Sequence, residues 1–132
     1  MKLITRDTDY AIRALVFIAH HKDKRISASH LVQELKIPRP FLRKILQMLH
    51  KKGVLISYKG QGGGFVLANS PQRIFLTDLI EIFQGPLKIN ECIFKKKICP
   101  NRNTCSLRRK ISSIEKQVLS GLRFITLASL LN

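Results

Sequence analysis

The chain contains three cysteines, which fall in one short stretch as Cys92, Cys99 and Cys105. Six residues separate the first two and five separate the last two, and both gaps exceed the roughly two to four residues typical between paired zinc thiolates. Soft thiolates suit an iron–sulfur cluster, which normally needs one more ligand than this stretch supplies. The spacing therefore favours a cluster over zinc, and zinc over unligated redox thiols.

An odd number of cysteines without an export signal argues against a disulfide framework and for a cytoplasmic location. The apolar run at residues 14–19 is too short for a membrane span. We therefore expect a cytoplasmic protein with no membrane partner.

The 132-residue chain is strongly basic, with 24 Lys and Arg against 8 Asp and Glu and a net charge of +16. The charge has two centres, +9 over residues 1–64 and +7 over residues 91–132, and no acidic residue lies between Leu35 and Thr77. Solvated faces usually mix the two signs, so this pattern predicts nucleic-acid binding.

Apolar spacing predicts three short helices that position the first basic centre. The first ends near His21, the second runs from its N-cap Ser27 through Leu35, and the third ends at Gly53 with its prolines in the opening turn. The capping candidates and first-turn acids of the first helix are Asp7, Thr8 and Asp9. Three short helices with tight breaks resemble a helix-turn-helix.

Beyond Gly53 the pattern becomes β-prone, with runs at 54–56 and 65–67 around a glycine-rich tip. No Gly-Lys-Ser/Thr follows the tip, so a phosphate loop is a weak interpretation. A hairpin whose glycines permit close approach suits a wing on DNA, and a plain turn is the alternative.

Thr77 is expected to cap a fourth helix that ends at Gly85-Pro86. From Leu107 onward, apolar residues recur at three- and four-residue steps through Leu122. One small domain cannot easily bury such a helix, so pairing with a second subunit is predicted, and packing on the first helix is the alternative.

The polar side of the third helix supplies the candidate DNA contacts. Arg39, Arg43 and Gln47 are base-reading candidates, because Arg suits guanine and Gln suits adenine. The remaining DNA-binding candidates, expected mainly at phosphates, are Ser27, Ser29, Lys44, Lys51, Lys59 and Gln61.

Several of these motifs occur together in one order: 8–11 (Thr-Asp-Tyr-Ala), 62–64 (three glycines), 85–86 (Gly-Pro), and the cysteines followed by Leu107-Arg108. In this arrangement the chain resembles the IscR/NsrR-type transcription regulators of the Rrf2 family over essentially its whole length. The resemblance implies a winged-helix homodimer on double-stranded DNA with a palindromic operator. It also implies a cluster that alters operator binding.

Carried over position by position, the resemblance makes Cys92, Cys99 and Cys105 the cluster ligands. The homeostasis branch uses a histidine three residues after the last cysteine, where this chain has Arg108. Asp9 matches the aspartate that the nitric-oxide-sensing branch supplies from the opposite subunit. A 4Fe–4S cluster is favoured and a 2Fe–2S cluster is the alternative.

The expected fold is mainly α with a small β-hairpin, a winged helix-turn-helix followed by a long C-terminal dimerisation helix. The expected parts are a DNA-binding domain at 1–86, a cluster loop at 87–106 and a dimerisation segment at 107–132. The function expected is a repressor-type regulator whose cluster senses nitric oxide, redox state or iron. The alternatives are a cluster-free regulator using thiols or zinc, and an electron-transfer protein. No catalytic constellation appears, so an enzyme is not expected.

Overall fold

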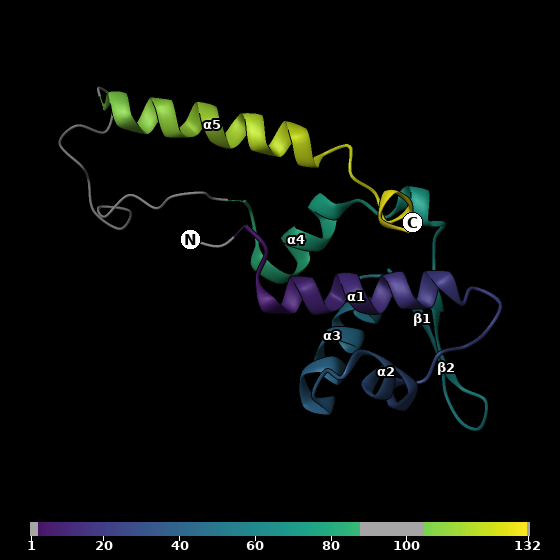
Figure 1. Cartoon of the computed structure of the whole chain (residues 1–132). Coiled ribbons are helices and arrows are strands. Elements are labelled where there is room, and N and C mark those ends of the chain that lie inside the picture. The colour runs from purple at the N-terminus through teal and green to yellow at the C-terminus, as the bar shows by residue number, and fades with distance from the viewer. Residues whose placement is uncertain (1–2, 88–104, 132) are drawn as a thin grey trace.

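The structure is a computed structural model that describes residues 3–87 and 105–131. Helix α1 (Arg6–His20) crosses the middle of the molecule (Figure 1). On one side of it lie α2 (Ala28–Leu35), α3 (Arg39–Lys51) and the tip of a hairpin, and on the other lie α4 (Leu76–Gln84) and α5 (Ser106–Leu122). We call α1 to α4 with the hairpin the head.

Helix α1 begins at Arg6, earlier than its capping candidates predict. Its N-cap is Thr5, whose hydroxyl accepts the Thr8 N–H at 3.4 Å. The prediction of a cap among Asp7, Thr8 and Asp9 is therefore wrong, whereas Asp7 and Asp9 are confirmed as first-turn acids. Thr8 points inward and is fully buried, which explains why it is not available as a cap.

Helices α2 and α3 form the expected helix-turn-helix. Ser27 caps α2, and Lys36 ends it in the left-handed region at φ 56°. Helix α3 begins after Pro38 with Pro40 in its first turn, where a missing N–H costs no intrahelical bond. The turn between the helices is therefore set by local residues, which is why the sequence predicted it.

The hairpin consists of strands β1 (Leu55–Tyr58) and β2 (Gly64–Leu67), which pair antiparallel with Leu55 opposite Leu67 and Tyr58 opposite Gly64. Each strand is a little longer than its predicted β-prone run. Ile26, just before α2, adds an isolated bridge to Phe65 of β2. The hairpin is therefore held on its β2 side to the segment before α2.

Helix α4 shows that the predicted Thr77 cap is wrong. The helix begins at Leu76, and its N-cap is Phe75, which provides no side-chain cap bond. The Leu76 N–H instead donates to the Ile125 carbonyl at 3.0 Å. A distant backbone segment thus satisfies the helix start, and Gly85 ends the helix as expected, with φ 76°.

Helix α5 lies beyond α4 and away from α2 and α3 (Figure 1). After it the chain returns to the head, where Phe75 and Thr126 form a bridge and the Leu127 N–H donates to the Ile74 carbonyl at 2.8 Å. We call residues 123–131 the return segment. It includes a short 3-10 turn at Ala128–Leu130, which contacts a second 3-10 turn at Pro71–Arg73.

The hydrophobic core lies inside the head, between α1, α3, the hairpin and α4. Leu15, Leu42, Leu46 and Leu49 are almost completely buried there, and Leu127 of the return segment joins them. The expected fold class is confirmed, because helices predominate and the sheet has two strands. Within residues 3–87 and 105–131, no helix is long and apolar enough to cross a membrane.

Candidate nucleic-acid interface

Helix α3 presents one buried and one exposed face. Its buried residues are Leu42, Ile45, Leu46 and Leu49. The base-reading candidates Arg39, Arg43 and Gln47 are all exposed, at four-residue steps that place them on one side of the helix. The three residues therefore lie together on the solvent-exposed side of α3, as predicted, and we call them the ridge.

Two serines at the start of α2, the N-cap Ser27 and Ser29, use their hydroxyls differently. The Ser29 hydroxyl accepts a hydrogen bond from the Arg39 guanidinium at 3.2 Å, which links the start of α2 to the start of α3. The Ser27 hydroxyl accepts the His30 N–H at 3.1 Å and is the α2 cap. Ser27 therefore already has a structural task, whereas Ser29 is exposed with Arg39.

The other predicted phosphate contacts surround α3. Lys44 and Lys51 are exposed on α3, and Lys59 and Gln61 are exposed at the hairpin tip. Gly60 and Gly62 in this tip have φ of 86° and 71°, values that favour glycine. The hairpin tip lies on the same side of α1 as α2 and α3 (Figure 1), which is the arrangement a wing requires.

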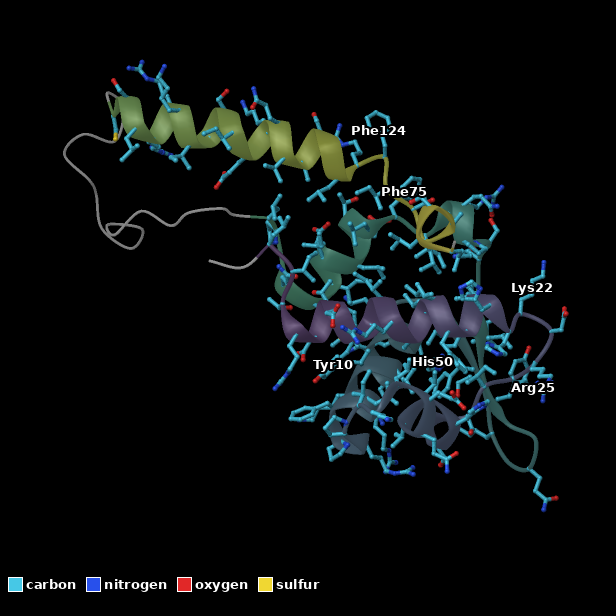
Figure 2. The ribbon with its side chains drawn as sticks, viewed as in Figure 1. Tyr10, Lys22, Arg25, His50, Phe75 and Phe124 are labelled. Carbon is cyan, nitrogen blue, oxygen red and sulfur yellow. The ribbon has the colours of Figure 1, made fainter. Side chains whose placement is uncertain are left out.

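Two arginines that sequence reasoning missed stack on aromatic rings near this face. The Arg6 guanidinium lies 4.3 Å from the centroid of Phe41 at the start of α3. The Arg25 guanidinium lies 3.8 Å from the centroid of Tyr58 on β1, and Figure 2 shows Arg25 beside the hairpin. Each pair joins distant parts of the sequence, so no local spacing indicates it.

A single amide joins the beginning of α1 to the end of α4. Gln84 accepts the Thr5 N–H at 2.9 Å and the Thr8 hydroxyl at 2.7 Å through Oε1. Its Nε2 donates to the Leu3 carbonyl at 3.1 Å. This contact satisfies the buried Thr8 hydroxyl and was not indicated by any motif.

The candidate cluster ligands are only partly within the described structure. Cys92 and Cys99 lie outside the described residues. Cys105 is half-buried at the N-cap of α5, where its Sγ accepts the Arg108 N–H at 3.4 Å. Cysteine sulfur is a soft metal ligand, and its position at the start of α5 leaves Cys105 a candidate ligand.

Asp9 lies in the first turn of α1 and forms an ion pair with Arg13 at 2.9 Å. Its side chain is partly exposed, which leaves it accessible to a second chain. Among the residues that the structure describes, no group of three or more His, Cys, Asp or Glu is gathered as a metal site. One chain's described part therefore does not bring Asp9 and Cys105 together with a further ligand.

The helix-turn-helix, the wing and the basic ridge together define a winged helix-turn-helix DNA-binding protein. The family model described as Rrf2, iron-dependent transcriptional regulator, matches residues 4–132. The chain belongs to the Rrf2 family. It is a DNA-binding transcription regulator and not an enzyme.

The relatives agree with this assignment. A protein of Aquifex aeolicus (strain VF5), named as a candidate HTH-type transcriptional regulator, is 34% identical over 125 residues, covering 93% of this chain and 87% of the relative. Two solved structures are similar in fold. The global cysteine regulator CymR of B. subtilis has a TM-score of 0.83 at 22% identity, covering 99% of this chain and 97% of that one. T. potens IscR has a TM-score of 0.76 at 23% identity, covering 99% and 86%.

Proposed function

We propose that the regulator acts as a homodimer on a palindromic operator, and that an iron–sulfur cluster in each subunit controls its affinity for DNA. The observation that carries the cluster proposal is Cys105 at the start of α5, with its thiol receiving a backbone N–H. The family description as iron-dependent regulators supports the same conclusion.

The dimer proposal rests on α5. None of its residues is buried within the single chain. The apolar residues that recur from Leu107 to Leu122 form a seam along the helix, and two of them, Leu107 and Ile114, are 67% and 48% exposed. Exposed apolar residues in a helical seam are stabilised by pairing with a second copy. Two chains joined through α5 would carry two heads, as a two-fold symmetric operator requires.

The four proposed cluster ligands are Cys92, Cys99, Cys105 and Asp9 of the partner subunit. When bound, the cluster would supply iron atoms that react with nitric oxide or oxygen and that depend on iron supply. Asp9 would have to exchange its Arg13 ion pair for the cluster. The neighbouring Thr8 hydroxyl donates to Gln84 at the end of α4. Gain or loss of the cluster at Asp9 would therefore change how the start of α1 packs against α4.

The cluster proposal is tested by oxygen-free purification followed by absorption and Mössbauer spectroscopy. We expect a brown protein with an iron–sulfur spectrum, and Cys105→Ala should lose it. Asp9→Ala should bind the cluster less stably and respond abnormally to nitric oxide, whereas the matched Asp7→Ala should resemble the wild type. An unchanged spectrum and nitric-oxide titration for Asp9→Ala would contradict Asp9 as a ligand.

A thiol-based regulator is the second candidate function. The fold similarity to CymR, the global cysteine regulator of B. subtilis, favours this alternative, as does the half-buried thiol of Cys105. A colourless, iron-free protein whose DNA affinity changes with thiol oxidation would support it. The same result would remove the cluster from the proposal.

The division of labour between ridge and wing is tested by one pair of variants. Arg43→Ala should reduce discrimination between operator and random duplex by roughly 1–3 kcal/mol, because Arg43 is a base-reading candidate. Lys59→Ala should weaken binding to all duplexes alike. Binding assays on both duplexes measure the difference, and equal losses for both variants would refute it.

A further inference from the structure

The connection between α1 and α2 runs along the hairpin. The Ile26 N–H donates to the Phe65 carbonyl at 3.1 Å, and the Phe65 N–H donates to the Ile26 carbonyl at 2.8 Å. This exchange brings the connection against β2. Residues next to Ile26 are therefore held at a fixed distance from the wing.

Gly64 makes this close approach possible. A Cβ at Gly64 would lie 2.7 Å from the carbonyl carbon and oxygen of Ile26, and the residue has φ 149°. Backbone atoms cannot yield as a flexible side chain does. The contact between connection and hairpin therefore requires glycine at this position.

Arg25 precedes Ile26 and reaches across to Tyr58, the residue paired with Gly64. Its guanidinium lies 3.8 Å from the Tyr58 ring centroid. Both residues are exposed, and Figure 2 shows Arg25 on the outer side of the molecule next to the hairpin. Stacking fixes the plane of the guanidinium while its N–H groups remain at the edge of that plane.

The residues next to this stack in the sequence are mostly basic. Lys22 and Lys24 lie on the same connection, and Lys59 follows Tyr58 directly. Asp23 is the one acidic residue of the connection at 22–25. Among the residues that the structure describes, the ion pairs found involve neither Arg25 nor Lys59.

We propose that Arg25 is a phosphate-binding residue of the wing, and that Tyr58 positions its guanidinium. Arg25 and Lys59 together would bind the sugar–phosphate backbone of the duplex beside the bases faced by α3. Planar guanidinium groups match phosphate geometry, and backbone contacts set register without reading sequence. The inference deepens the DNA-binding function and is independent of cluster and dimer.

The test compares the full-length wild type with Arg25→Gln on a labelled random-sequence duplex at several salt concentrations. Arg25→Gln should weaken binding by about tenfold. The slope of log affinity against log salt should become shallower by about 0.9 for each bound subunit. The matched control is Arg73→Gln, which removes the same charge at the 3-10 turn near the return segment and should leave the slope near the wild-type value.

Tyr58→Leu tests the positioning part. It should lose most of the affinity that Arg25→Gln loses, and the double variant should be little worse than either single variant, because both remove one interaction. Arg25→Lys should keep the salt slope but bind less tightly, since an ammonium cannot stack as a guanidinium does. Circular dichroism melting verifies that each variant is folded.

A folded Arg25→Gln with the slope of Arg73→Gln would overturn the phosphate contact. Additive losses from Arg25→Gln and Tyr58→Leu would overturn the positioning role. A wild type that binds no duplex at any salt concentration would instead count against DNA binding itself. The failure of this inference and the failure of the broader function therefore give different results.

Discussion

The head and α5 treat apolar side chains in opposite ways. In the head, Leu15, Leu42 and Leu49 are completely buried within one chain. Along the 17 residues of α5, no side chain is buried, and Leu107 and Ile114 are exposed. The difference shows that the DNA-binding half is complete in a single chain, whereas α5 has an apolar seam that a single chain does not cover.

The buried polar groups of the head are also paired within the single chain. Among the described residues, every buried side-chain nitrogen or oxygen atom has a hydrogen-bond partner. In the head this includes the fully buried Thr8, whose hydroxyl donates to Gln84 at the end of α4. Buried polar groups cost free energy when they are unpaired, so the head has its polar interior matched as well as its apolar one.

The largest effect expected from this comparison is dissociation of the dimer. Ile114→Glu places a carboxylate in the apolar seam of α5, and an uncompensated buried charge costs about 3–5 kcal/mol. We expect the dimer dissociation constant to rise at least about a hundredfold, measured by sedimentation velocity. Ser120→Glu, on the opposite side of the helix by its period, is the control and should remain dimeric.

A monomeric wild type at micromolar concentration would contradict the proposal that a second chain covers the apolar seam of α5. In that case the exposed apolar residues of α5 would need another partner.

The next largest effect lies inside the head. Leu46→Ala removes a side chain that is 1% exposed and should lower the free energy of unfolding by about 2–5 kcal/mol. Urea denaturation measures it. Leu107→Ala on α5 is the control, and its loss at low protein concentration should stay within about 0.5 kcal/mol. Equal losses from both would mean that α5 is as well packed as the head.

Alanine substitutions at two glycines of the hairpin distinguish a steric clash from backbone strain. Gly64→Ala meets both the Ile26 backbone at 2.7 Å and a positive φ, whereas Gly60 has φ 86° with nothing within 4 Å of a Cβ. Strain alone costs about 1–2 kcal/mol, so Gly60→Ala should lose about that much and Gly64→Ala more. Thermal unfolding compares them, and equal losses would show that the connection moves aside.

The smallest effect concerns the α2 cap. Ser27→Ala should lower the free energy of unfolding by about 1 kcal/mol, because its hydroxyl accepts the His30 N–H. Its DNA affinity, corrected for the unfolded fraction, should stay close to that of the wild type. Ser29→Ala, which loses a contact to Arg39, should show the reverse pattern. A large DNA effect for Ser27→Ala would make the serine a phosphate contact as well.

Local patterns predicted the head well. The end of α1 and the bounds of α2 and α3 lie close to those predicted from apolar spacing. Ser27 and Gly85 are a cap and a terminator that act within a few residues. The start of α4 was wrong because a bridge between Phe75 and Thr126 sets it. Contacts between residues that are far apart in sequence have no periodic signature.

The candidate site also has one part that local spacing predicts and one part that depends on distant contacts. The Arg39, Arg43 and Gln47 ridge could be predicted, because a helical period places those residues on one face. The stacking of Arg25 on Tyr58 could not, since it depends on how the first connection lies against the hairpin. The roles of Cys92 and Cys99 stay predictions, and so does ligation by Asp9.

The return segment has a consequence for how the protein is made. Leu127 completes the head core. Its N–H donates to the Ile74 carbonyl, and the Ile125 carbonyl accepts the Leu76 N–H. A ribosome synthesises α5 before this leucine, so the nascent head emerges with its core one side chain short. The head is expected to close only after Leu127 has left the ribosome, and a premature stop just after α5 would damage DNA binding although α1 to α4 are present.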